Sequence, residues 1–189
     1  MSAEDWLRQR LLDCDGIVIF SDPTKPPDEY MTTFRNLFED LHTRHSQNAG
    51  QPLNVPVAVV IPKIDLLSRM IAVGQRAAQA DRLLGELRQS RAINEGTTLQ
   101  AIKGRSDLIG ELLRDVVPLA HIRSTAEAVV GRGRVMVFPV ATLGWHESPY
   151  KHLASLGPAG HGYLVQNSFG VLDPVLWLLH QLGVRPLPV

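Results

Sequence analysis

The chain has 189 residues, 44% hydrophobic and 20% charged, a composition typical of one globular domain with a core of its own. Nineteen Lys and Arg residues balance nineteen Asp and Glu residues, so charge gives no reason to expect nucleic acid or an anionic membrane surface as a partner. The single Cys14 excludes an internal disulfide and fits a reducing cytoplasm. No apolar run approaches the roughly 18 residues that span a bilayer, so we expect a cytoplasmic protein without membrane insertion.

The first third of the chain alternates between helical and extended patterns. Residues 2–13 predict an amphipathic helix capped by Ser2. The apolar run GIVIF, residues 16–20, predicts a short strand that ends in the turn-rich SDPTKPP. Apolar residues then recur at helical spacing over residues 28–45. The continuous run over residues 55–61 predicts a second strand, and such uninterrupted runs are typical of sheets covered on both faces.

The rest of the chain predicts more helix, one strand and a closing helix. Residues 66–130 are helix-rich, with interruptions expected at residues 94–96, at Lys103–Gly104 and at Pro118. VMVFPV, residues 135–140, predicts a third strand that ends near Pro139, and residues 143–170 predict a long loop. The closing helix is expected to have Asp173 as its cap, Pro174 at its first position and Gly183 as its stop.

This order predicts an α/β fold with a parallel three-stranded sheet and helices on both faces. The strands are expected at about residues 15–21, 55–61 and 134–140, in the order 1-2-3. We expect a single domain over residues 1–189, with a helical insert at about residues 66–131.

The segment VPVAVVIPKID, residues 55–65, is the strongest functional signal in the chain. Its strand runs into a loop that carries Lys63 and Asp65, and this end of a parallel sheet is where open α/β sheets bind ligands. A carboxylate there can accept two parallel N–H bonds from a guanine edge. The alternative is an ordinary strand-to-helix junction in which Asp65 caps the helix that begins at Leu66.

In order and spacing, these motifs resemble the second half of a Ras-like P-loop GTPase domain of the translation-factor-related class. DGIVIFSDPT is similar to the fourth strand of such a domain, VPVAVVIPKID to the fifth strand and its guanine-specificity loop, and VMVFPVATLG to the sixth strand and its Ser-Ala-type loop. GVLDPVLWLLHQLG is similar to the last helix. The pattern is closest to bacterial double-GTPase-type domains, in which an FPVSALG strand end and a P-LLWLL helix are typical.

The resemblance implies GTP or GDP as the ligand and assigns a role to four residues. Asp65 would bind the guanine N1 and N2 groups, and Lys63 would lay its stem along the base and ribose. Thr142, beside Ala141, would offer a backbone N–H to the guanine O6. Pro62 replaces the usual Asn or Thr and removes the hydrogen bonds that brace this loop.

The phosphate-binding half of such a domain is missing from this sequence. No G-x-x-x-x-G-K-[ST] motif occurs, and no Asp-x-x-Gly precedes the first strand to hold magnesium. We therefore expect a truncated GTPase-like domain that does not hydrolyse GTP and does not bind magnesium by itself. The resemblance suggests a truncated gene, a fragment, or one half of a split domain, whose missing half a partner chain would supply or cover.

Two other functions remain open on the sequence. The first is a protein-interaction or scaffold module that keeps the fold without a nucleotide and presents an unpaired sheet edge to a partner. The second is an unrelated α/β enzyme that uses the histidine-containing loop with His146, His152 and His161. Asp22 and Thr24 could touch a ligand at the sheet edge, although Ser-Asp-Pro-Thr is also a good turn sequence. The pair His42 and His45 has a spacing that can hold zinc, but a solvated helix face is the simpler interpretation.

Overall fold

The computed structural model describes residues 14–22, 27–46, 54–64, 85, 98–113, 117–141, 170–184 and 187–188. Its centre is a parallel sheet of β1 (Ile17–Phe20), β2 (Val57–Ile61) and β3 (Val135–Pro139), in the order β1-β2-β3. Ile17 is paired with Val57, which in turn is paired with Val135, so the three strands start together. The predicted sheet, its parallel sense and its strand order are confirmed, and each strand is slightly shorter than predicted.

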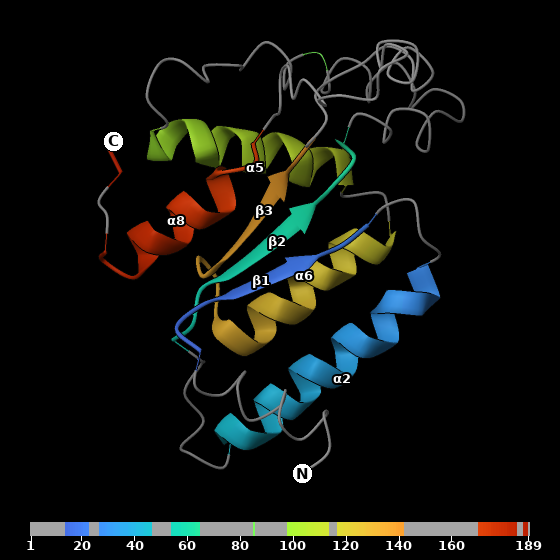
Figure 1. The fold of residues 1–189 in the computed structure, drawn as a ribbon. Helices are drawn as coiled ribbons and strands as arrows, with labels where there is room; N and C mark the ends of the chain where they lie inside the picture. Colours follow the sequence, from blue (N-terminus) through green and yellow to red (C-terminus); the bar gives the residue numbers. More distant parts are fainter. Residues whose placement is uncertain are drawn as a thin grey trace, which may run out of the picture.

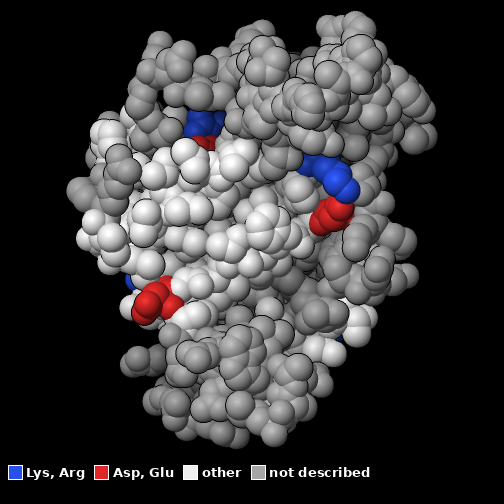
Figure 2. All heavy atoms as spheres, in the orientation of Figure 1, with Lys and Arg blue, Asp and Glu red and all other residues white. Residues whose placement is uncertain are grey.

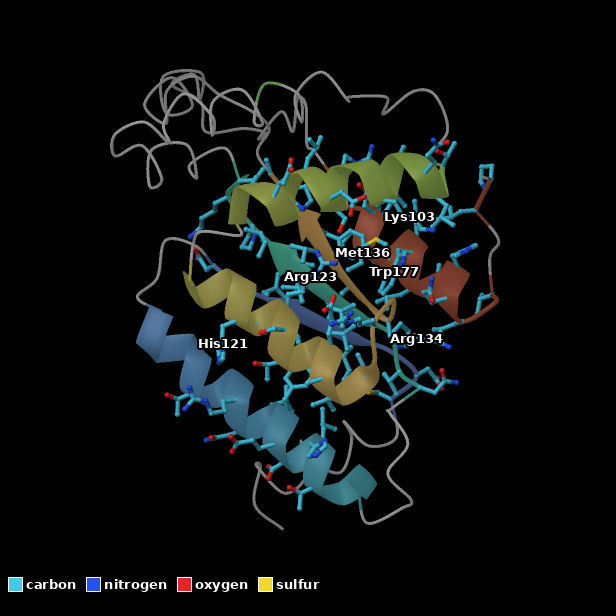
Figure 3. The ribbon with its side chains drawn as sticks, turned by 180° about the vertical axis from the view of Figure 1, so that it is seen from behind. Lys103, His121, Arg123, Arg134, Met136 and Trp177 are labelled. Atoms are coloured by element: carbon cyan, nitrogen blue, oxygen red, sulfur yellow. The ribbon has the colours of Figure 1, made fainter. Side chains whose placement is uncertain are left out.

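Helices cover both faces of this sheet, as predicted (Figure 1). Helices α2 (Pro27–Ser46) and α6 (Val117–Val130) lie over one face, and α8 (Asp173–Gln181) lies over the other. Seen from behind, α6 crosses in front of the sheet, and α2 lies beside α6 (Figure 3). Helix α5 (Leu99–Leu113) lies against β3.

The central strand explains the continuous apolar run in the sequence. All five residues of β2 are buried, because alternate side chains enter two separate apolar layers. On one face Val57 and Val59 pack with Phe38 of α2 and Ile122 of α6. The opposite layer joins alternate residues of β2 and β3 with α5 and α8, and comprises Ala58, Val60, Ile102, Phe138, Val140, Trp177 and Leu187. The ring centroids of Phe138 and Trp177 are 5.6 Å apart in a tilted arrangement.

Helix α5 contradicts one prediction, because it continues without a break through Lys103–Gly104. A glycine inside a helix costs only about 1 kcal/mol relative to alanine. Ile102 and Ile109 are fully buried on either side of that point. Packing of these side chains outweighs the local preference of the glycine. Helix α5 ends at Leu113 and α6 begins at Val117, so the interruption expected near Pro118 is confirmed.

Both ends of α8 were predicted, and two details at its N-terminus are wrong: Asp173 is not the cap, and Pro174 is the second residue of the helix and not the first. The N-cap is Leu172, which makes no side-chain capping bond, whereas Asp173 lies inside the helix and directs its carboxylate to Arg105. At the other end Gly183 has φ +70° and stops the helix as predicted. The Gly183 N–H donates to the His180 carbonyl at 3.1 Å and the Val184 N–H to that of Leu179 at 2.9 Å, which is a Schellman motif.

Candidate functional site

The three strands are parallel, so the residues that follow them leave the sheet at one shared edge. Asp22 lies two residues beyond the end of β1, and Lys63 lies two residues beyond the end of β2. Ala141 lies two residues beyond the end of β3. The register therefore brings Lys63 and Ala141, both predicted from the sequence, to the same carboxyl edge.

Lys63 has an unusual backbone conformation. Its φ is +56°, and among the described residues it is the only non-glycine residue with a positive φ. This left-handed conformation costs about 1–2 kcal/mol for a residue with a Cβ, so surrounding contacts must hold the loop in place. Such outliers are concentrated at ligand-binding positions.

An ion pair joins Lys63 to the end of the neighbouring strand. Its Nζ donates to Oδ2 of Asp22 at 2.7 Å. The Lys63 side chain is 49% exposed and that of Asp22 is 21% exposed, so the pair lies at the surface, with the carboxylate the more enclosed partner. On sequence alone Asp22 is a turn residue with a possible ligand contact, and only the parallel register places it beside the lysine.

Backbone hydrogen bonds fasten the other side of the Lys63 loop to β3. The Val140 N–H donates to the Ile61 carbonyl at 2.9 Å, and the Ile64 N–H donates to the Val140 carbonyl at 3.2 Å. Ala141, the next residue, is almost completely buried. The loop of β2 is thus held between Asp22 on one side and the Val140–Ala141 segment on the other.

The other two predicted guanine-binding residues, Asp65 and Thr142, lie outside the described residues, as do His146, His152 and His161. His42 is exposed on α2, which fits the solvated helix face expected for it.

Within the part of the chain that the structure describes, no three His, Cys, Asp or Glu side chains are grouped closely enough to hold a metal ion. In that same part, no helix combines the length and apolar character needed to cross a membrane.

No protein-family model, curated protein or solved structure matches the chain. The resemblance to a GTPase domain therefore stays a prediction, and any functional proposal depends on the geometry of the carboxyl edge.

A second ion pair, which the sequence analysis missed, lies between α5 and the start of α8. Arg105 donates from Nε and from a terminal guanidinium nitrogen to Asp173 Oδ2, at 2.8 and 2.7 Å. Both side chains are less than 10% exposed. A buried pair of this kind fixes one helix relative to another. No local signal in the sequence could reveal it, because its two residues are 68 positions apart.

Proposed function

We propose that this chain is a guanine-nucleotide-binding module of the GTPase type that does not hydrolyse GTP by itself. The observation that supports the proposal is Lys63, held at the carboxyl edge in a left-handed conformation between Asp22 and the Val140–Ala141 segment. A lysine so placed offers its aliphatic stem to a planar base and its ammonium to polar atoms of the sugar. The ligand is GTP or GDP, and the proposal assigns no magnesium ion to this chain.

Base recognition in this proposal depends on residues that follow β2 and β3. Asp65 accepts the paired N–H bonds of guanine, and the backbone N–H of Thr142, beside Ala141, donates to O6. Adenine presents an acceptor at N1, so it would leave the carboxylate unpaired, which costs about 1–3 kcal/mol. Affinity is expected to be weak, since no phosphate-binding loop occurs in the sequence and Pro62 removes one brace of the loop.

Calorimetry with GDP, GTP and ADP tests this function on the full chain and on its Asp65→Asn variant. The wild type should prefer GDP and GTP over ADP by about tenfold or more, and Asp65→Asn should abolish the preference. Asp15→Asn is the matched control, because Asp15 is exposed at the opposite end of β1. Equal binding of the three nucleotides, or no effect of Asp65→Asn, would contradict the proposal.

One observation favours a second candidate, a protein-interaction module. Val18 and Phe20 of β1 are 41% and 70% exposed, although they point to the same face as the buried Ala58 and Val60 of β2. In the described ranges no strand pairs with the outer edge of β1. Leu172 and Val175, at the start of α8, are also exposed, and Figure 2 shows the described part of this face as an area with charged side chains only at its margins. Large apolar side chains exposed on a sheet face beside an unpaired edge are typical of interaction sites.

In this second function a partner chain pairs with or covers the outer edge of β1. A photo-cross-linking amino acid in place of Phe20 tests it in the native host. It should capture one defined protein, whereas the same probe in place of the exposed Asn36 on α2 should not. Equal capture from both positions would count against an interaction surface on β1.

A further inference from the structure

We infer that Asp22 is the positioning residue for Lys63, so that the loop after β1 sets the nucleotide preference of the loop after β2. The inference rests on the proposed function and deepens it. Its basis is the 2.7 Å ion pair between Lys63 Nζ and Asp22 Oδ2, which spans two neighbouring strands at the carboxyl edge.

Pro62 limits the hydrogen bonds that the Lys63 loop can make to its neighbours. Pro62 has no N–H and no polar side chain, so it cannot donate a hydrogen bond to a neighbouring loop. Lys63 adopts a conformation that its Cβ disfavours, and its side chain has a long, flexible stem. On one side the Ile64–Val140 hydrogen bond fastens the loop to β3. On the other side, the ion pair with the Asp22 carboxylate links it to the end of β1.

The charge of Asp22 also affects what Lys63 can recognise. With its ammonium paired to a carboxylate, Lys63 presents less net positive charge to a phosphate, and the ion pair restricts the positions that its aliphatic stem can take. This arrangement favours contact with a base over general attraction of anions. Removal of the Asp22 charge should therefore weaken the preference for one base and raise the dependence of binding on salt concentration.

The test compares Asp22→Asn with Asp22→Glu, and uses Asp15→Asn as the control at the other end of the same strand. Calorimetry with GDP and ADP should show GDP affinity lower by about two- to fivefold in Asp22→Asn, with a smaller ratio of GDP to ADP affinity. Asp22→Glu should restore part of both quantities. Asp15→Asn should behave as the wild type does.

Amide hydrogen exchange provides a readout that needs no ligand. Exchange of the Ile64 N–H should be faster in Asp22→Asn, while that of the buried central-strand residue Val59 should stay unchanged. The charge-reversed pair Asp22→Lys with Lys63→Asp should restore slow exchange at Ile64 but not GDP affinity, because the cation then lies on the wrong loop.

The outcomes separate the two proposals. A wild-type chain without any GDP preference would contradict the proposed function, and the exchange of Ile64 would still decide whether Asp22 holds the loop. If Asp22→Asn leaves both the GDP-to-ADP ratio and the exchange of Ile64 at wild-type values, the positioning role is wrong. An equal increase of exchange at Ile64 and Val59 would also overturn it, since that result indicates a general loss of stability.

Discussion

At the scale of single residues, Gly170 lies just before α8 and beside the end of β3. Its φ is +64°, and a Cβ added there would clash with the Pro139 carbonyl oxygen. We expect Gly170→Ala to lower the free energy of unfolding by about 2–4 kcal/mol, because the backbone conformation disfavours a Cβ and the obstacle is backbone. Urea unfolding followed by circular dichroism measures this change.

Gly104 is the matched control for this substitution. It lies within α5, no atom outside its own helix backbone comes within 4 Å of the position that a Cβ would take, and its φ is not in the left-handed region. Gly104→Ala should stabilise the protein by about 0.5–1 kcal/mol, since alanine is the better helix former. Equal effects of the two substitutions would show that the geometry at Gly170 is not the cause.

The ion pair of Arg105 and Asp173 is buried, so each charge depends on the other for its compensation. Asp173→Ala would leave the Arg105 guanidinium buried without its partner, so we expect a loss of about 3–5 kcal/mol of unfolding free energy. Glu127→Ala is the comparison, because Glu127 pairs with the 41% exposed Arg123 on α6 and should cost less than about 1 kcal/mol. Thermal unfolding of both variants measures these losses of unfolding free energy. Equal losses would contradict the prediction.

At the scale of elements, α5 protects the outer edge of β3. The Ser106 side chain is buried, and its Oγ accepts a hydrogen bond from the Val137 N–H at 3.2 Å. Ser106→Ala should cost about 1–3 kcal/mol, because it leaves a buried strand N–H without a partner. Amide exchange at Val137 should become faster. Ser124→Ala, at an exposed position on α6, should change stability by less than about 0.5 kcal/mol.

The elements show which features a sequence can predict. β2 was predictable because each of its residues is apolar, and a strand buried on both faces needs that pattern. The continuity of α5 through Gly104 was not, because it depends on the burial of Ile102 and Ile109 in the two apolar layers. The role of Asp173 was missed for the same reason. Its local context is that of a helix cap, and the partner that changes its role lies on another helix.

At the scale of the whole molecule, the two edges of the sheet differ. β3 is covered by α5, while the outer edge of β1 has no strand beside it among the described residues and carries the exposed Phe20. The candidate site lies at the carboxyl ends of the strands, where the residues that follow β1, β2 and β3 leave the sheet. Lys63 and Ala141 were predictable as residues that follow parallel strands. The link from Lys63 to Asp22 was not, since it arises from the register of β1 against β2.

The last prediction concerns catalysis by the whole chain. Phosphoryl transfer depends on a phosphate-binding loop and a magnesium ion, which supply most of the stabilisation of the developing charge. The sequence contains no G-x-x-x-x-G-K-[ST] segment, so the proposed base recognition at Lys63 and Asp65 would position a nucleotide without activating its phosphates. We expect the purified chain to release phosphate from GTP no faster than buffer does, with or without magnesium. Magnesium-dependent release that disappears in Asp65→Ala would contradict this prediction, whereas release that persists in that variant would indicate a contaminating enzyme.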